Sequence, residues 1–341
     1  ISIRSRTEIR LIRSLTLGTD YKFWMDNSYI IKIEGLTRDF KSTRAVDALD
    51  LTIQTGELFG LVGPDGAGKT TTLRLLAGLL NITKGSATIA DYDLKSQPEA
   101  IKSFIGYMAQ QFSLYAELTV LENLRFFAEI YNVDKGDLAE RTDNLLKFAG
   151  LTEFTDRRAA HLSGGMQKKL ALACTLIHQP EILLLDEPTT GVDPISRREF
   201  WNILTDLHLE GTTILVSTPY MDEADRCSRV GLMYAGSMVI CDTPKNIRGR
   251  IQAELIELIP HDWQSAYEQV KTLPGVFEVQ TYGESLHILV DSGEKRLPQI
   301  EKSLNKRNIR YQSARIAPTR MEEAFISLIR QMDEGSDLVG K

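Results

Sequence analysis

A glycine-rich run early in the chain has the composition of a phosphate-binding loop. It lies between an apolar segment, residues 58–62, and a helix-like segment, residues 73–80. Glycine lets consecutive backbone N–H groups turn toward a polyphosphate, and the start of the following helix attracts the same anion. The run therefore predicts a strand, a loop and a helix that hold a nucleotide through Gly63, Pro64, Asp65, Gly66, Ala67, Gly68, Lys69, Thr70 and Thr71.

Two carboxylates further along the chain complement this loop. Residues 182–188 form an apolar run that ends in Asp186 and Glu187. Such a run predicts a buried parallel strand, which delivers its last side chains to the ligand-binding edge of the sheet. Lys69 would reach the β- and γ-phosphates, and Thr70 and Asp186 would hold Mg²⁺. Glu187 would orient or deprotonate the attacking water.

A second anion-binding pattern lies between these segments. Ser163 is a typical helix N-cap, and it is followed by Gly164, Gly165, Met166 and Gln167. A hydroxyl, free N–H groups and the helix dipole together favour an anion. Because one chain then has two phosphate-binding elements, each ATP is expected to lie between two copies or two related subunits.

The elements expected to position these residues alternate between strand and helix. Residues 29–57 predict antiparallel strands, residues 98–175 are expected to be mostly helical, and strand–helix alternation resumes over residues 181–240. Residues 119–127 predict a Thr-capped helix, and its apolar stripe is assigned to the core: Leu118, Leu121, Leu124 and Phe127.

Beyond Pro244 the pattern changes to strand, helix, hairpin, helix and strand, the split βαβ order of a ferredoxin-like module. Its Trp263 and Tyr282 are predicted to be packing residues, and a final helix is expected over residues 319–332. The fold class is α/β: a P-loop NTPase with an antiparallel β subdomain and a helical lobe, plus a small C-terminal α+β ferredoxin-like domain. The expected domains are residues 29–247 and 248–318, with a C-terminal helix and tail at 319–341.

In their order, these segments resemble the Walker A, signature and Walker B motifs of the ATP-binding subunits of ABC transporters. The resemblance covers about residues 30–247. It implies that Phe40 stacks on adenine; a loop or core phenylalanine is the alternative. It implies that Gln110 contacts Mg²⁺ and water and links the site to a membrane subunit, with Gln111 as the alternative register. Asp193 would cross the dimer interface, or simply cap a helix.

The resemblance also implies that the helical lobe contacts the membrane subunit, for which the exposed candidates are Phe112, Leu114 and Tyr115. One family residue is missing. After the segment 213–217 the family usually places a histidine that contacts the γ-phosphate, but Pro219 stands there. Proline has neither a side-chain donor nor a backbone N–H. Either this chain is the weakly hydrolysing half of an asymmetric pair, or Glu187, Lys69 and Mg²⁺ suffice.

The sequences of residues 63–71, 171–176 and 191–199 resemble those of a narrower group, the YbhF-type bacterial multidrug and cation exporters. This implies an ATPase subunit, cytoplasmic and peripheral on the inner face of the bacterial plasma membrane. Its partners would be an integral membrane transporter subunit and a second ATPase domain, in a homodimer or heterodimer. The alternatives are a soluble ABC ATPase that acts on ribosomes or DNA, and a non-hydrolysing regulatory ATP-binding module.

Composition bounds these readings. The 341 residues carry a formal net charge of −6, which argues against a nucleic-acid partner because such binders have a basic surface. The three cysteines have no paired spacing, which favours a reducing compartment over a disulfide or zinc framework. Residues 1–28 are expected to be an N-terminal extension that is disordered or mis-annotated.

Overall fold

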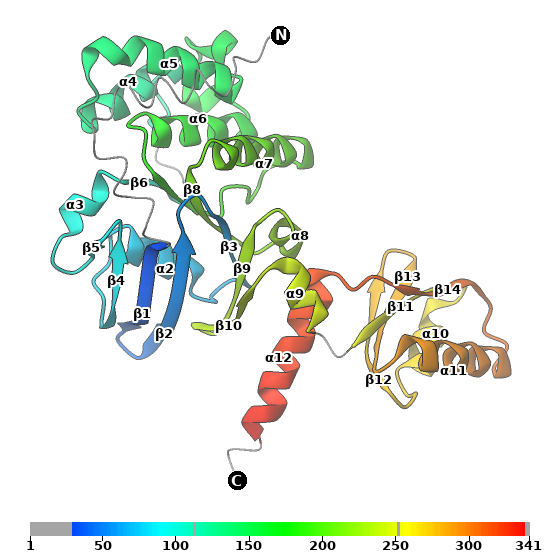
Figure 1. Ribbon diagram of the computed structural model, residues 1–341. Helices are drawn as coiled ribbons and strands as arrows, with labels where there is room; N and C mark the ends of the chain where they lie inside the picture. Colours follow the sequence, from blue (N-terminus) through cyan, green and yellow to red (C-terminus); the bar gives the residue numbers. More distant parts are fainter. Residues whose placement is uncertain (1–28, 112–113, 251–252, 338–341) are drawn as a thin grey trace.

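The computed structural model describes residues 29–111, 114–250 and 253–337, with side chains through Ile329. The predicted extension at residues 1–28 and the docking candidate Phe112 lie outside this part of the chain. The described residues form three sheets and the helices that pack on them (Figure 1).

The first sheet is antiparallel and has the order β2-β1-β4-β5. Its strands are β1 (Tyr29–Phe40), β2 (Thr43–Gln54), β4 (Lys84–Ile89) and β5 (Tyr92–Asp93). In β1 the apolar Ile31 and Ile33 are buried while Lys32 between them is exposed, as a half-buried strand requires. The antiparallel strands predicted for residues 29–57 are confirmed.

The central sheet has the order β10-β9-β3-β8-β7-β6. Its strands are β3 (Leu58–Val62), β6 (Ile105–Met108), β7 (Ile182–Asp186), β8 (Thr213–Thr218), β9 (Arg229–Tyr234) and β10 (Ser237–Asp242). All pairings are parallel except that of β10 with β9. Every residue of β3, β7 and β8 is buried, because helices or the first sheet cover both faces. The carboxyl ends of these three strands therefore meet at one edge.

Helices flank this sheet, and in Figure 1 the lobe of α4, α5 and α6 lies at its upper end. The bounds are α2 (Lys69–Leu76), α3 (Pro98–Lys102), α4 (Val120–Ile130), α5 (Lys135–Ala149), α6 (Gly164–Leu176), α7 (Pro194–Leu209), α8 (Met221–Ala224) and α9 (Pro244–Gly249), with 3₁₀ turns η2 (Thr152–Phe154) and η3 (Ala159–His161). Strand β6 interrupts the stretch expected to be mostly helical, because its four residues pair with β7.

Helix α4 begins with the predicted Thr119 cap, completed as a capping box by Glu122. Of the predicted core stripe, Leu124 is fully buried and Phe127 packs against the lobe core, while Leu118 and Leu121 are half-buried. The fully buried face of α4 also contains Val120 and Ala128, with the polar Asn123 beside them. Of the docking candidates, Leu114 is half-buried against the lobe core, whereas Tyr115 is 48% exposed.

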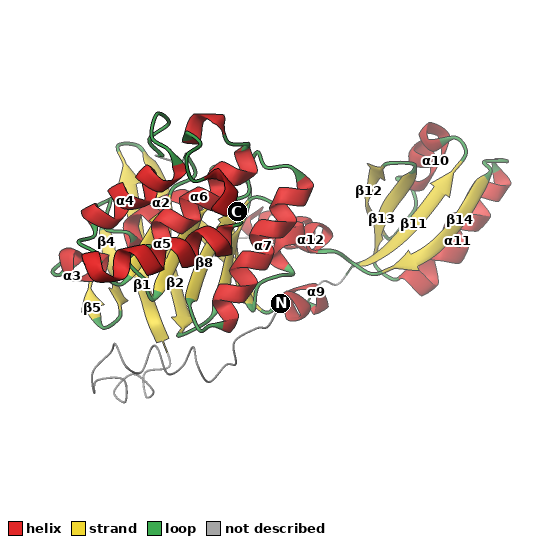
Figure 2. Cartoon of the chain, turned by 90° about the horizontal axis from the view of Figure 1, so that it is seen from above, coloured by secondary structure: helices red, strands yellow, loops and turns green. Residues whose placement is uncertain are grey.

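The third sheet has the order β12-β13-β11-β14 and is antiparallel throughout. Its module consists of β11 (Glu254–Pro260), α10 (Trp263–Val270), β12 (Val276–Tyr282), β13 (Ser285–Val290), α11 (Gly293–Lys306) and β14 (Tyr311–Ala317). Helices α10 and α11 lie together on one face of this sheet (Figure 2). The element order is the predicted ferredoxin-like βαββαβ, while the domain boundaries at residues 247 and 318 stay a prediction.

The prediction that Trp263 and Tyr282 are packing residues is wrong for Trp263 and holds in part for Tyr282. Their side chains are 59% and 53% exposed, because Trp263 opens α10 and Tyr282 ends the edge strand β12. Tyr282 nevertheless stacks on His287 with 4.7 Å between the ring centroids.

The last helix, α12 (Met321–Asp337), returns to the ATPase part of the chain. Met321 and Ala324 join the core cluster that contains Trp201, and Phe325 and Leu328 pack against it. In Figure 1 this helix lies beside α9, so the ferredoxin-like module is held at both ends by the same region. None of the described helices combines the length and apolar character needed to span a membrane.

Candidate nucleotide site

The loop after β3 has the shape that the sequence predicted. Lys69 starts α2 and donates from Nζ to the carbonyl oxygens of Gly63, at 2.8 Å, and Pro64, at 3.0 Å. Gly68 precedes the helix with φ +103° and provides no side-chain cap, so the first N–H groups of α2 are available to an anion. A Cβ on Gly68 would lie 2.4 Å from the carbonyl oxygen of Ala45, so only glycine fits this close approach.

Asp186 lies at the end of β7, next to this helix start. Its Oδ1 accepts hydrogen bonds from the hydroxyls of Thr70, at 2.9 Å, and Ser217, at 2.8 Å. Its Oδ2 is buried and has no hydrogen-bond partner in the described part of the chain. Mg²⁺ prefers oxygen ligands, and the free Oδ2 of Asp186 and the hydroxyl of Thr70 supply two of them side by side. The residues present therefore fit the metal that the sequence predicted here.

Glu187 follows directly and is held on both carboxylate oxygens. Lys69 Nζ lies 3.2 Å from Oε1, and the Gln110 amide donates to Oε2 at 2.8 Å. The Glu187 backbone has φ +46°, a conformation that non-glycine residues rarely adopt, and its N–H donates to the Ser217 hydroxyl at 3.0 Å. The structure thus brings together Lys69, Thr70, Gln110, Asp186 and Glu187. The individual roles predicted for them stay predictions.

The predicted signature residues lie at the start of α6. The Ser163 hydroxyl accepts a hydrogen bond from the Met166 N–H at 3.3 Å, as an N-cap does, and Gln167 donates to the Ala159 carbonyl at 2.9 Å. Gly164 and Gln167 line a cavity of about 410 Å³ that Gln110 also lines. The nucleotide contact predicted for Ser163, Gly164 and Gly165 stays a prediction.

Asp193 and Phe40 have clear local surroundings. Asp193 caps α7, because its Oδ1 accepts from the N–H groups of Ile195 and Ser196; bonds from Ser196 hold the pKa of this carboxyl below its usual range. Its contact across a dimer stays a prediction. Phe40 is 40% exposed, so it is a surface rather than a core aromatic, and the Arg38 guanidinium lies 4.5 Å from its ring centroid. Stacking of Phe40 on adenine stays a prediction.

The segment around Pro219 reveals residues that sequence reasoning missed. Buried Glu223 accepts hydrogen bonds from the Thr218 hydroxyl, from the Thr189 hydroxyl at 2.8 Å and from Arg197 Nε at 2.6 Å. This network ties the residue before Pro219 to α7, the helix that Asp193 caps. The sequence indicates this network only through Glu223, a charged residue at a position of the short helix α8 that an apolar side chain would ordinarily fill.

Lys168 is a second residue missed by sequence reasoning. Burial lowers the pKa of its ammonium group, and Nζ donates to the Gln110 carbonyl at 3.0 Å. The start of α6 is thereby joined to the segment that carries the predicted link between site and membrane subunit.

Comparison with known proteins agrees with this geometry. The ABC transporter family matches residues 46–190. The probable multidrug ABC transporter ATP-binding protein YbhF of Escherichia coli is 40% identical over 248 residues, which are 70% of this chain and 43% of that protein. The chain thus spans less than half the length of YbhF. The daunorubicin resistance ATP-binding protein DrrA2 of Streptomyces coeruleorubidus is 30% identical over 91% of this chain and 98% of its own length.

Among solved structures, the ATP-binding cassette MJ0796 is a dimer in a post-hydrolysis state bound to ADP and Pi. It is 27% identical and covers 62% of this chain and 98% of its own, with a TM-score of 0.58. This chain belongs to the ABC transporter family of ATP-binding proteins, whose activity is ATP hydrolysis. The family resemblance and the P-loop ABC fold predicted from the sequence are confirmed.

Proposed function

We propose that this chain is the ATP-binding subunit of a membrane exporter and works as one of two ATPase domains that close on ATP face to face. The printed names of YbhF and DrrA2, multidrug transport and drug resistance, support export. The dimer of MJ0796 supports pairing. Its place would be the cytoplasmic face of a bacterial plasma membrane, against an integral membrane subunit.

The observation that carries this proposal is the cluster at the edge of the central sheet. Bound Mg-ATP would supply the phosphoryl group and the metal charge needed for its transfer to water. Lys69 would leave Glu187 to contact the β- and γ-phosphates, while Thr70 and Asp186 hold the metal. Glu187, still bonded to Gln110, would accept the proton of the attacking water. Phosphoryl transfer depends on positioning and charge, and these side chains contribute to both.

The free oxygen of Asp186 gives a direct test. In Asp186→Asn one ligand oxygen becomes an amide, so we expect Mg²⁺ to lose most of its effect on the affinity for a fluorescent ATP analogue. Nucleotide binding without metal should change little. Asp143→Asn on the exposed surface of α5 is the matched control. An unchanged Mg²⁺ effect in Asp186→Asn would contradict the assigned metal site.

We further propose that this chain hydrolyses ATP slowly and completes a partner's site with Ser163. The supporting observation is Pro219, which directly follows β8 and has no side-chain donor. We expect ATPase activity of the isolated chain to rise in Pro219→His and to vanish in Glu187→Gln. Rapid turnover by the unaltered chain, abolished by Glu187→Gln and unimproved by histidine, would refute slow hydrolysis.

The proposal of a membrane partner has its own test. Purification from membranes should yield the chain together with an integral membrane subunit. Co-sedimentation with ribosomes in place of membranes would refute the exporter and favour a soluble ABC ATPase.

A further inference from the structure

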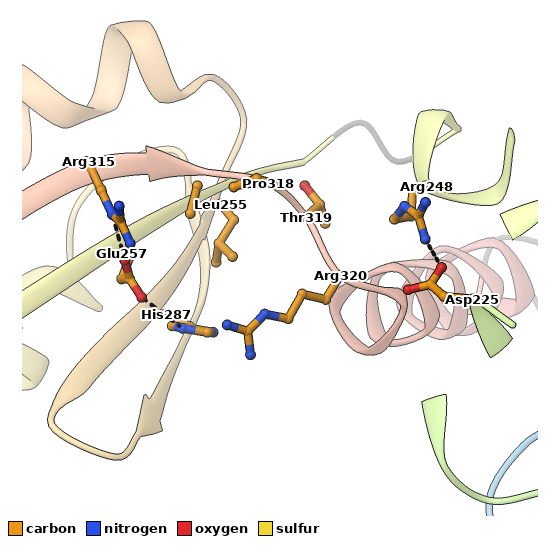
Figure 3. A pocket seen from close by; sticks show the side chains of 10 residues that line it. Asp225, Arg248, Leu255, Glu257, His287, Arg315, Pro318, Thr319 and Arg320 are labelled. Atoms are coloured by element: carbon orange, nitrogen blue, oxygen red, sulfur yellow. Dashed lines mark hydrogen bonds and ion pairs between the residues drawn. The ribbon is translucent and has the colours of Figure 1, made fainter. Parts of the chain in front are cut away.

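A second cavity lies between the ferredoxin-like sheet and the ATPase part, away from the nucleotide site. Its volume is about 400 Å³, within the range of small-molecule pockets. Figure 3 shows its walls: side chains of β11, β13 and β14 on one side, and the segment that leads into α12 with Arg248 and Asp225 on the other. Residues from both parts of the chain therefore line one space.

His287 on β13 is the first feature that points to a ligand. Its ring is 96% buried by side-chain area, since only 4% remains exposed, and Nδ1 lies 3.2 Å from Glu323 Oε1. Its Nε2 is buried without a hydrogen-bond partner among the described residues; the Glu257 carboxylate is 3.9 Å away, too far for a hydrogen bond. In Figure 3 this ring and the guanidinium of Arg320 point toward one another. A buried ring nitrogen of this kind calls for a polar partner.

Arg320 is the second feature. Two other arginines of the cavity are neutralised, Arg248 by Asp225 and Arg315 by Glu257 at 2.6 Å. Arg320 forms no ion pair within 4 Å in the part of the chain that the structure describes, and its guanidinium lies 4.7 Å from the ring centroid of Tyr282. A guanidinium without an ion-pair partner in a cavity favours an anionic ligand beside it.

The third feature is an apolar wall next to these two groups. Leu255 is almost fully buried at 1% exposure, and Ala317 and Pro318 continue the wall toward Arg320. A pocket with an apolar wall and a few convergent polar groups is the usual design of a small-molecule site. Inorganic anions would leave this wall without a partner.

We propose that this cavity binds a small organic carboxylate. Its carboxylate lies on the Arg320 guanidinium, beside the His287 ring, and its apolar body lies on Leu255, Ala317 and Pro318. Arg320 directly precedes α12. On that helix, the Glu323 carboxylate accepts a hydrogen bond from the backbone N–H of Arg320 at 2.9 Å and also contacts His287. Because α12 packs in the ATPase core, an occupied cavity fastens the ferredoxin-like sheet to that core. The site is therefore a place where a small acid stabilises one arrangement of the two parts.

The experiment uses the full chain with ¹⁵N-labelled histidine and hexanoate as the probe. The ring resonances of His287 are identified by their absence in His287→Gln. We expect them to shift saturably with hexanoate, to shift less with acetate, and to need about tenfold or more hexanoate in Arg320→Gln, the loss of one charged hydrogen bond. Arg310→Gln, at an exposed arginine outside the cavity, is the matched control and should bind as the unaltered chain does.

A second variant keeps the test independent of charge. Ala317→Leu fills the apolar wall and should abolish the shift with hexanoate while leaving ATP binding intact, which separates this site from the proposed exporter function. The proposal is overturned if His287 shows no saturable shift, or if Arg320→Gln binds hexanoate as the unaltered chain does. Equal affinity for hexanoate and inorganic phosphate would also overturn it, because the apolar wall would then contribute nothing.

Discussion

The buried ion pair between Lys69 and Glu187 makes a strong prediction about the nucleotide-free protein. Their side chains are only 3% and 5% exposed, at a distance of 3.2 Å. Lys69→Met removes the cation and keeps an unbranched side chain of similar length. Glu187 then retains the Gln110 amide at 2.8 Å and the Thr190 hydroxyl at 3.4 Å as side-chain partners. A buried charge that loses its partner destabilises the fold by about 3–5 kcal/mol, and we expect about 3 kcal/mol because these two donors remain.

The reverse substitution should be milder. In Glu187→Gln the ammonium group of Lys69 keeps the carbonyl oxygens of Gly63 and Pro64, at 2.8 and 3.0 Å. We therefore expect a loss of about 1 kcal/mol, the size of one hydrogen-bond rearrangement. The double variant leaves no unpaired charge, so its loss should fall short of the sum by about 2 kcal/mol, a typical coupling for residues in direct contact.

Urea unfolding without nucleotide measures these values. Trp201, 1% exposed in the ATPase core, is the fluorescent reporter in a background where Trp24 and Trp263 are phenylalanine. The control is Lys147→Met, which breaks the exposed pair with Asp143 and should cost less than about 1 kcal/mol. A coupling below about 0.5 kcal/mol between Lys69 and Glu187 would refute the reasoning, because the two side chains would then be independent in the free protein.

Two further predictions concern the loop and the ferredoxin-like module. In thermal unfolding, Gly68→Ala should destabilise the protein more than Gly66→Ala. Both glycines have positive φ, which costs alanine about 1–2 kcal/mol, but a Cβ on Gly68 would also lie 2.4 Å from the carbonyl oxygen of Ala45. Equal losses of stability in the two variants would contradict this clash. Hydrogen bonds from Arg296 lower the pKa of Asp291 to about 2. The Asp291–Arg296 pair therefore stabilises the fold fully above the pKa of an unfolded aspartate, ~3.9, and this stabilisation is lost as the pH falls through about 2. The urea midpoints of the unaltered chain and Asp291→Asn should therefore differ at neutral pH and converge near pH 2, and a constant difference would contradict the pair.

The nucleotide site was accessible from the sequence because its residues end buried parallel strands or start helices. Asp186 and Thr70 are 116 positions apart, yet both were predicted to hold one metal, and their side chains are hydrogen-bonded in the structure. Strand ends in a parallel sheet share one edge, so topology alone brings such residues together. Glycine spacing supplied the loop, since Gly68 meets a backbone oxygen that no side chain could tolerate.

Other features depend on tertiary packing and could not be predicted in this way. Strand β6 has four residues, too few for a periodic pattern, and its pairing with β7 makes it a strand. Helix α12 was expected as a helix, but its docking on the ATPase core was not, because its apolar stripe does not name a partner. Tyr282 has a large aromatic side chain of the kind often found in a core, but its position on the edge strand β12 leaves it exposed.

The surroundings of Glu187 give the physical basis of the effect proposed for Pro219. In the free protein Lys69 and Gln110 hold the two oxygens of this carboxylate, one each. If Lys69 moves to the phosphates, the Glu187 carboxylate keeps two hydrogen-bond donors, Gln110 and the Thr190 hydroxyl. Both are neutral, so no cation remains beside it. A histidine at position 219 would supply a further donor on the side of β8, where Pro219 provides none. The proposed slow hydrolysis thus follows from how few groups remain to orient Glu187 once its lysine is engaged elsewhere, and Pro219→His restores one of them.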